Sequence, residues 1–392
     1  MLRTIKELDV HNKIAILRLD LNLPSKEGKF TDATRIIRSL PTIKYLQSMQ
    51  AKIVIISHMG RPKGLFSREL SLAPVVDELE KHIKTKVLFA TDCLGTKVKS
   101  KIEDLKFGDI LLLENLRFHK EEEENDEHFA QKIASLGDVF INDCFSCSHR
   151  KHASIEKIAQ ILPSAAGFLL IDEINNLQNL LQSPQKPFTA IIGGSKISTK
   201  IDLLFSLLDK VDNLILAGAM ANTFLGGQKI CIGKSMTEST LESVAIEIIK
   251  TSQQKQTKIF LPQDFIVQNT AGEIFLRIAG QIKQDEAIMD VGPGFTNQIA
   301  KLINQSKTLV WNGPLGAFET QPFDAASIQT ARTIASATIN NNLNSIAGGG
   351  DTIALLKSSG MLSAVKYTST GGGAFLAWFE GKDLPGIRVL YK

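Results

Sequence analysis

A regular alternation of short apolar runs with longer amphipathic segments is the feature that most constrains how this 392-residue chain can fold. The apolar runs are continuous, whereas a half-exposed strand would alternate polar and apolar residues. Continuous apolar strands separated by helical segments are typical of parallel sheets that are buried on both faces. The expected strands are 14–19, 53–56, 87–89, 110–113 and 139–141 in the first half, and 189–192, 214–216, 259–261, 288–289, 308–311 and 345–347 in the second.

Helical periodicity fills the segments between these runs. In 201–211, apolar side chains recur on one face at Leu204, Leu207, Leu208 and Val211. The segment 164–181 is also predicted to be a helix, and the SPQKP sequence that follows it breaks the pattern. We therefore expect an α/β protein of two halves, with a helix able to connect them.

Composition excludes several classes of protein. The net charge of +4 comes from 45 basic and 41 acidic residues, so it gives no indication of nucleic-acid binding. The longest apolar stretch, 161–171, is interrupted by Pro163 and is too short to span a membrane. Four cysteines in a chain of this length do not form a disulfide scaffold, and no signal peptide is visible. We therefore expect that the protein has no membrane partner and that it is located in a reducing cytoplasm.

Polar residues follow the strands of the first half, where a parallel sheet binds its ligands. They include His58 and the four arginines Arg35, Arg61, Arg117 and Arg150. Arginine recognises phosphate and carboxylate groups through two parallel hydrogen bonds. The set predicts a small ligand with several anionic groups, and surface salt bridges are the alternative.

Glycine-rich loops follow the strands of the second half. They begin at Gly193, Gly218, Gly292, Gly313 and Gly348. Glycines allow a backbone to approach phosphate closely, so the loops predict a nucleotide site, with tight turns as the alternative.

Three charged residues in these loops refine the prediction. Lys196 and Lys200 are predicted to share one face at the start of a helix, where an anion would separate their charges. Asp351 follows three glycines and would be a hard oxygen ligand for Mg²⁺, or else a helix cap.

A second cluster of reactive residues competes with this interpretation. Cys144 and Cys147 are followed by His149 and His152. Four ligands within nine residues would wrap poorly around one zinc ion. A dithiol oxidoreductase would leave the glycine loops unexplained. The two thiols could instead be joined by mild oxidation, or both could be unreactive buried side chains.

The ordered motifs resemble those of phosphoglycerate kinases of the bacterial type. The sequence RLDLNLP at 18–24 resembles the family's R-x-D-x-N-x-P signature. The resemblance continues with SHMGRP at 57–62, ENLRF at 114–118, GGSKISTK at 193–200, WNGP at 311–314, GGGDT at 348–352, STGGG at 369–373 and LPG at 384–386. Each motif alone is weak, but the ordered set covers nearly the whole chain.

The resemblance implies two doubly wound, Rossmann-like parallel-sheet domains, separated by a cleft and joined by a helix. A phosphoglycerate-binding domain would occupy 1–165, and a connecting helix and linker 166–185. A nucleotide-binding domain would occupy 186–379, and a tail from about residue 380 to residue 392 would return to the first domain.

Matched residue by residue, the resemblance also implies the site residues. The substrate contacts would be Asp20, Leu21, Asn22, Arg35, His58, Met59, Gly60, Arg61, Arg117 and Arg150. The nucleotide contacts would be Lys196, Lys200, Glu319, Gly349, Gly350, Asp351 and Thr352, with Asp351 holding Mg²⁺. The residues that carry the transfer would be Arg35, Lys196, Gly349 and Gly350.

The implied reaction is reversible phosphoryl transfer from 1,3-bisphosphoglycerate to Mg-ADP, giving 3-phosphoglycerate and ATP in glycolysis. Transfer would be direct and in line, after closure of the domains, in a cytoplasmic monomer. A non-catalytic nucleotide-binding protein on the same fold is the alternative, although Arg35, Lys196 and Asp351 are all present. Two positions depart from the family pattern. Leu23 replaces a small residue, and Ser146 replaces a glycine, which is expected to shift the loop that holds Arg150.

Overall fold

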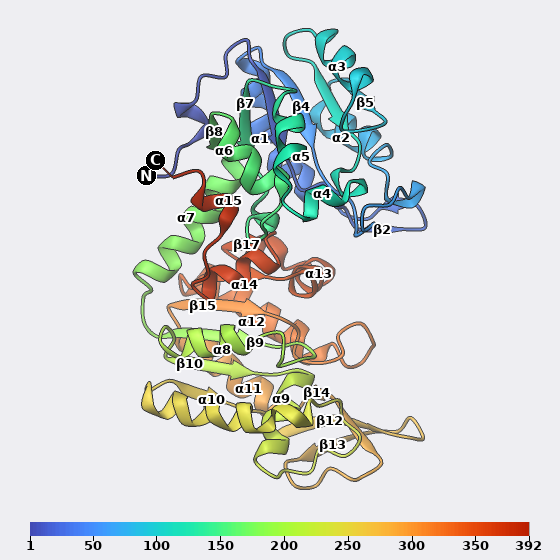
Figure 1. Ribbon diagram of the computed structural model, residues 1–392. Coiled ribbons are helices and arrows are strands. Elements are labelled where there is room, and N and C mark those ends of the chain that lie inside the picture. The colour runs from blue at the N-terminus through green and yellow to red at the C-terminus, as the bar shows by residue number, and fades with distance from the viewer. Residues whose placement is uncertain (392) are drawn as a thin grey trace. The chain divides into compact units, whose positions relative to one another are not determined.

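The computed structural model describes residues 1–391, which divide into two compact units, each built on a six-stranded parallel sheet (Figure 1). The first unit contains Met1–Asn175 and the chain from Asp383 onward, and the second contains Asn176–Lys382. The division falls within one helix, α7 (Phe168–Gln182). No helix in the described part of the chain is both long enough and apolar enough to cross a membrane.

The first sheet has the strand order β5-β6-β4-β1-β7-β8, and helices lie on both of its sides (Figure 1). Its strands are β1 (Ile14–Arg18), β4 (Lys52–Ile56), β5 (Val87–Ala90), β6 (Ile110–Leu113), β7 (Val139–Asn142) and β8 (Ser164–Ala166), with a separate hairpin of β2 (Ser25–Lys26) and β3 (Lys29–Phe30). The helices of this unit are α1 (Thr34–Ser48), α2 (Val75–Ile83), α3 (Thr96–Glu103), α4 (Lys120–Glu123), α5 (Glu127–Ala134), α6 (Ile158–Ile161) and α15 (Pro385–Arg388).

The second unit repeats this plan with the strand order β11-β10-β9-β15-β16-β17. Its parallel strands are β9 (Phe188–Ile192), β10 (Asn213–Leu216), β11 (Lys258–Phe260), β15 (Thr308–Asn312), β16 (Asn344–Gly348) and β17 (Tyr367–Ser369). Its helices are α8 (Ile201–Leu208), α9 (Ala219–Gly227), α10 (Glu242–Gln254), α11 (Pro293–Gln305), α12 (Ala325–Asn340), α13 (Gly350–Ser358) and α14 (Gly373–Phe379). An additional antiparallel sheet contains β12 (Asp264–Asn269), β13 (Ile274–Ile278) and β14 (Glu286–Val291).

Each parallel sheet is buried because its strands carry apolar side chains toward both faces. In β1, Ala15 and Leu17 pack with α1 and α2, while the intervening Ile16 is buried on the opposite face. In β15, Leu309 and Trp311 pack with α11 and α12 in the same way. Burying each large apolar side chain contributes about 1.5–3 kcal/mol. The continuous apolar runs of the sequence therefore lead to two doubly wound sheets.

Two sequence predictions about local structure were wrong. The run 288–289 belongs to β14 of the antiparallel sheet and is not part of a parallel sheet. The predicted helix 164–181 is divided into β8, which pairs with β7, and the helix α7. Gly167 separates the two elements, and a Cβ there would overlap the carboxylate of Asp143. Residue 167 must therefore be a glycine for the chain to pass from β8 to α7.

The start of α7 is held by three groups of the first unit. The backbone N–H of Phe168 donates to Thr42 Oγ1 at 2.9 Å, and that of Leu170 donates to Asp143 Oδ1 at 3.0 Å. Arg38 of α1 forms ion pairs with Asp172 at 3.0 Å and with Glu173 at 3.2 Å. Burial raises the pKa of Asp143 to about 7. The first two turns of α7 are therefore fixed to the first unit.

The C-terminal segment completes the first unit. The N–H of Gly386 donates to the carbonyl of Ser148 at 3.0 Å, and Asn142 Nδ2 donates to the carbonyl of Gly386 at the same distance. Arg388 pairs with Glu156 at 2.6 Å. Gly386 is packed so closely that an added Cβ would lie 2.6 Å from Ile155 Cγ2. The segment is thus seated against the loop that follows β7.

Gly386→Ala should weaken this seating, because the added methyl group has no space beside Ile155. Overpacking of this kind costs about 1–3 kcal/mol. Hydrogen–deuterium exchange should show that the amides after Asp383 exchange faster, by about 10-fold for each 1.4 kcal/mol of this cost. Gly350→Ala is the matched control, because a Cβ at Gly350 has no heavy atom within 4 Å. Equal protection of the segment in both variants would contradict the prediction.

Candidate functional site

A buried arginine organises the carboxyl edge of the first sheet. Arg18 is the last residue of β1 and is fully buried. Its guanidinium donates to the carbonyl of Leu19, to Ser154 Oγ at 3.0 Å and to His58 Nδ1 at 3.1 Å. Because arginine can only donate, Nδ1 of His58 is the acceptor and Nε2 carries the hydrogen. Nε2 faces the thiol of Cys147, whose Sγ lies 3.9 Å from this nitrogen.

Asp20, Asn22 and Arg35 form a second network directly after β1. Arg35 Nη1 pairs with Asp20 Oδ1 at 3.0 Å and also donates to the carbonyl of Asn22. Asn22 Oδ1 accepts from the N–H of Gly60 at 2.9 Å, which links the loops after β1 and β4. Ser146 donates its hydroxyl to Asp20 Oδ2, so the serine anchors its loop to this network. Arg35 keeps Nε and Nη2 without a partner among residues 1–391.

The loop after β4 supplies the remaining predicted substrate contacts of this region. The N–H of Leu21 donates to Ser57 Oγ at 3.0 Å. The carbonyl of Met59 accepts from Asn115 Nδ2 at 2.8 Å, and that of Gly60 accepts from Arg117 Nη1 at 2.7 Å. These bonds bring the ends of β1, β4 and β6 together.

Cations outnumber their protein partners at this edge. Within the described chain, the side chains of Arg61 and Arg150 form no hydrogen bond or ion pair, whereas Nε of the buried Arg117 lies 3.5 Å from Glu123 Oε1 in an ion pair without a hydrogen bond. Burial lowers the pKa of Arg117, with Arg18 and Arg150 adding to the effect. Burial followed by repulsion from Arg117 lowers the pKa of His152 to about 3. The edge therefore has a local excess of positive charge that an anionic ligand would neutralise.

Cys144 and Cys147 lie beneath this edge and are buried. Cys147 Sγ lies 3.9 Å from Arg18 Nη2 and from His58 Nε2. The hydrogen bond from Cys144, together with His58 and Arg18, holds the pKa of Cys147 well below its ordinary value. Burial holds the pKa of Cys144 well above its ordinary value. Oxidation of the pair stays a prediction.

In the second unit, Lys200 connects the loops that follow the central strands. Its ammonium donates to the carbonyl of Gly193 after β9 and to Asn312 Oδ1 at 2.8 Å at the end of β15. Asn312 Nδ2 in turn donates to the carbonyl of Gly348 at 2.7 Å, at the end of β16. Burial lowers the pKa of Lys200 to about 8, and the nearby charge of Asp351 opposes this effect. Lys200 is therefore both a structural cation and a candidate ligand of phosphate.

The prediction that Lys196 and Lys200 share a helical face was wrong. Helix α8 begins at Ile201, and Lys200 is its N-cap residue with φ −133°. The preceding residues form a turn because Glu238 accepts from the N–H of Ser198 at 2.9 Å and from its hydroxyl at 2.6 Å. Lys196 is exposed and its ammonium has no hydrogen bond or ion pair with any residue from 1 to 391.

The glycines of the second unit are of two kinds. A Cβ at Gly193 would overlap the carbonyl oxygen of Pro314, and one at Gly218 would lie 2.6 Å from the carbonyl oxygen of Gly194. These glycines are required because loop backbones touch. At Gly350, a Cβ would meet no heavy atom within 4 Å, and the backbone is not left-handed. Packing within the second unit therefore does not explain Gly350.

The start of α13 presents the predicted phosphate-binding groups. Gly349 is the N-cap residue with φ 99°, and the first turn contains Gly350, Asp351 and Thr352. The hydroxyl of Thr352 accepts from the N–H of Gly313 at 2.7 Å, which fixes this turn to the loop after β15. Asp351 is exposed and has no hydrogen bond or ion pair within the described chain. The free backbone N–H groups of the first turn of α13 and the unpaired carboxylate of Asp351 thus lie side by side.

A cavity of about 470 Å³ adjoins this turn. Its wall is mainly apolar and includes Met236, Phe265 and Leu315, while Glu319 and Asp351 are among its polar lining residues. A mainly apolar slot with a few polar groups is the usual form of a site for a small organic ligand. The cavity brings Glu319 and Asp351, which are 32 positions apart in the sequence, to one site.

Several supporting residues were not predicted from the sequence. Ser57 and Asn115 hold the backbones of predicted contacts, while Arg18 holds the ring of His58 and Asn312 holds the ammonium of Lys200. Three of them had a visible signal, because Ser57 follows β4, Asn312 ends β15, and Asn115 comes two residues after β6. Arg18 had none beyond its place in a motif, since a charged residue at the end of a strand is usually solvated.

Comparison with known proteins agrees with the sequence motifs. The phosphoglycerate kinase family model matches residues 5–382. The chain is 49% identical to a phosphoglycerate kinase of Orientia tsutsugamushi (strain Ikeda), over 99% of this chain and 97% of that protein. It is 46% identical to that of Brucella melitensis, over the full length of both. The structure of phosphoglycerate kinase from Coxiella burnetii superposes with a TM-score of 0.87 at 40% identity, covering 100% of this chain and 99% of that chain.

Lys200 should make stability depend on pH. Its pKa is about 8 in the folded protein and 10.5 in a solvated lysine, so the unfolded chain binds more protons between these values. The free energy of unfolding should therefore rise with pH in this window, by roughly 2 kcal/mol from pH 7 to pH 10. Urea unfolding of the wild type and of Lys200→Met should differ by this amount.

The control for this measurement is Lys301→Met, at an exposed position of α11, which corrects for the loss of one positive charge. A wild-type profile parallel to that of Lys200→Met would show that burial of Lys200 does not affect its protonation.

Proposed function

Because the chain belongs to the phosphoglycerate kinase family, we propose that its first unit binds the phosphoglycerate and its second unit binds the nucleotide. The enzyme is a phosphotransferase with a carboxyl acceptor, and it catalyses the reversible glycolytic conversion of 1,3-bisphosphoglycerate and ADP into 3-phosphoglycerate and ATP. The observation that carries the assignment of the units is the excess of uncommitted arginine groups at the edge of the first sheet.

The phosphoglycerate would be held by these arginines. Arg61 and Arg150 have whole guanidinium groups available, and Arg35 has two free nitrogens. Phosphate and carboxylate oxygens accept such paired N–H donors well. Asp20 and Asn22 would bind the hydroxyl of the glycerate. His58, whose Nδ1 accepts from Arg18 and whose Nε2 faces Cys147, would line the site beside them. The backbones of Leu21, Met59 and Gly60, together with Arg117, would shape the pocket.

The nucleotide would occupy the cavity beside α13. The apolar wall suits a purine ring, and Glu319 would accept hydrogen bonds from ribose hydroxyls. The phosphates would lie against the N-terminus of α13, where the N–H groups of Gly350 and its neighbours are free and the helix dipole is positive. Lys200 would add charge beneath them, and the close approach would require the absence of a side chain at Gly350.

Asp351 fits a role in holding Mg²⁺. Its carboxylate is exposed, borders the cavity and has no partner in the described part of the chain. Mg²⁺ is commonly bound through one or two carboxylates together with substrate phosphates and water. When bound, the ion would neutralise charge on the nucleotide phosphates.

Phosphoryl transfer would depend on positioning and charge, because the nucleophile is already ionised. In the direction of ATP synthesis, a terminal oxygen of ADP attacks the phosphorus of the acyl phosphate. The bond from phosphorus to the carboxyl oxygen breaks, and that oxygen leaves as a carboxylate. Arg35 and Lys196 would stabilise the equatorial oxygens of the migrating group, with N–H groups of Gly349 and Gly350. Because these residues belong to different units, closure on both substrates would complete the site.

We also propose that the enzyme acts as a monomer in the cytoplasm. All four cysteines are free thiols, as a reducing compartment would maintain them.

Lys196→Ala should lower kcat by roughly 10²–10³, the usual effect of losing one preorganised charge donor. The KM for ADP should change much less, because the ammonium acts on the group that is transferred. A coupled assay of ATP formation from 1,3-bisphosphoglycerate measures both constants. A normal kcat with only a raised KM would assign Lys196 to ground-state binding instead.

Gly350→Ala should separate catalysis from stability. The Cβ has space in the protein itself, so the variant should fold with unchanged thermal stability. If phosphates approach this backbone, the methyl group should lower kcat/KM by at least about 10-fold, equivalent to a loss of 1.4 kcal/mol. Gly193→Ala is the contrasting variant and should be destabilised, because its Cβ would overlap Pro314. Full activity of Gly350→Ala would place the phosphates elsewhere.

A further inference from the structure

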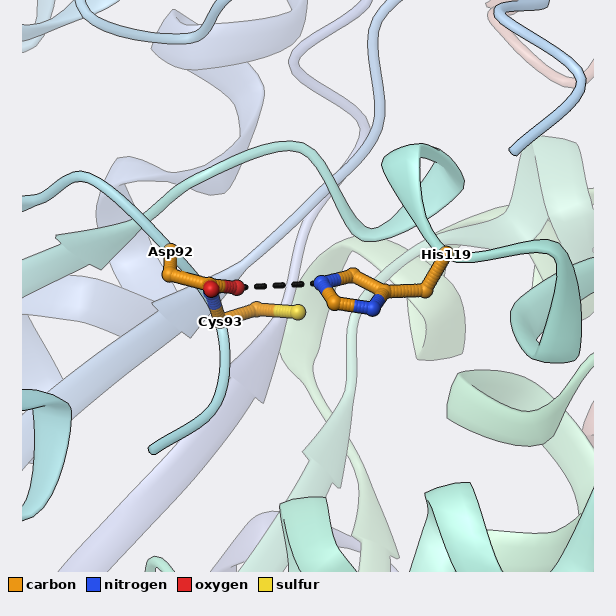
Figure 2. A group of neighbouring side chains, drawn as sticks. All are labelled: Asp92, Cys93 and His119. Carbon is orange, nitrogen blue, oxygen red and sulfur yellow. Dashed lines mark hydrogen bonds and ion pairs between the residues drawn. The ribbon is translucent and has the colours of Figure 1, made fainter. Parts of the chain in front are cut away.

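Asp92, Cys93 and His119 form a cluster outside the site described above (Figure 2). Asp92 and Cys93 follow β5, and His119 comes directly after the 3₁₀ helix η3 (Leu116–Phe118). One ligand atom from each residue lies within 4.8 Å of the other two. Figure 2 shows the thiol and the carboxylate on the same side of the imidazole ring. Two segments that are distant in the sequence thus direct three metal-ligating groups toward one point.

The thiol of Cys93 has no evident role within the protein. It is 1% exposed, and no hydrogen bond to its sulfur is found anywhere in residues 1–391. The charged groups that act on it are carboxylates, namely Asp92, Glu122 and Glu114. The carboxylate oxygen of Asp92 lies within 4.8 Å of the sulfur, so the surroundings of this buried thiol suit a cation.

The other two groups are held in place by the fold. Asp92 Oδ1 accepts from the N–H of Cys93 at 2.7 Å and from His119 Nε2 at 3.0 Å. The ring of His119 packs against Phe129, with centroids 5.4 Å apart, and its backbone N–H donates to the carbonyl of Leu116. The contacts with the N–H of Cys93, with Phe129 and with Leu116 would orient the ligands of a metal site, whereas a metal would replace the Asp92–His119 hydrogen bond.

We propose that Asp92, Cys93 and His119 bind a divalent transition metal of the zinc class, with water in the fourth position. Bond lengths of 2.0–2.3 Å place the ligands of a tetrahedral zinc ion about 3.3–3.7 Å apart. Asp92 and His119 are 3.0 Å apart, and no two of the three ligand atoms are more than 4.8 Å apart, so small side-chain movements would bring them to this spacing. A thiolate and an imidazole select zinc, cobalt or copper over magnesium, so the site is chemically distinct from the nucleotide-linked one. Binding replaces the thiol proton, which is released to solvent, and requires the neutral His119 ring to carry its hydrogen on Nδ1 while Nε2 binds the metal.

A metal bound at this site would connect two loops of the first unit. His119 lies two residues after Arg117, on the segment that carries this predicted substrate contact. A bound ion would fasten this segment to the loop after β5, at the outer edge of the sheet. The inference does not depend on the proposed roles of the active-site residues.

Cobalt(II) is the probe for this site, because a thiolate ligand gives it a near-ultraviolet charge-transfer band and tetrahedral coordination gives it intense visible bands. The full-length protein, reduced and freed of metal, is titrated with Co²⁺ in excess Mg²⁺, which occupies sites made of oxygen ligands alone. The expected result is saturation of both sets of bands at one ion per chain, and their loss when Zn²⁺ is added.

Four variants decide the assignment. Cys93→Ala should abolish the charge-transfer band, and His119→Gln should weaken Co²⁺ binding by more than about 10-fold. Cys231→Ala and His128→Gln remove the same functional groups elsewhere and should bind like the wild type. Circular dichroism and Mg²⁺-dependent activity establish that each variant is folded. Absence of the band in the wild type, or its persistence in Cys93→Ala, would overturn the proposal.

Discussion

Burial of the central strands on both faces is the constraint on which the rest of the structure depends. A strand such as β4 or β15 cannot place a polar side chain along its buried length without losing hydration. Inside the strands, buried polar side chains such as Thr189 and Ser345 are hydrogen-bonded to other side chains. Polar groups available to a ligand therefore lie where the strands end, and parallel strands end at one edge. Arg18 shows the requirement most clearly. Its charge is fully buried at the last position of β1, and it is tolerated because Leu19, Ser154 and His58 accept its hydrogen bonds.

The same constraint explains what could be predicted from the sequence. The apolar runs locate nearly every central strand, because a strand buried on both faces needs an unbroken run. The search for apolar runs does not identify β8, because its three small residues, Ser164–Ala166, carry little hydrophobic signal. The same search does not identify β13, which is solvated on one face and alternates exposed and partly buried residues. These elements depend on pairing with neighbouring strands, which the local sequence does not specify.

The sites differ in predictability for a related reason. Residues directly after strands, such as His58 and Gly193, could be identified because strand order alone brings them to the edge. The conformation around Lys196 could not, since Glu238, 40 residues after Ser198, imposes the turn. The proximity of Cys93 and His119 also had no sequence signal, because they are 26 positions apart and lie on two different loops. Likewise, counting glycines does not distinguish Gly193, required by backbone packing, from Gly350, which packing leaves free.

The seating of the C-terminal segment in the first unit has a consequence for synthesis on the ribosome. The first unit lacks Gly386 and Arg388 until the whole second unit has been translated. At about 5–20 residues per second, the 213 residues from Asn176 to Arg388 require roughly 10–40 s. During this time the loop after β7 exposes the surface that the segment later covers. The second unit, which is continuous in sequence, has no such delay, so the unit begun first is the last to be completed.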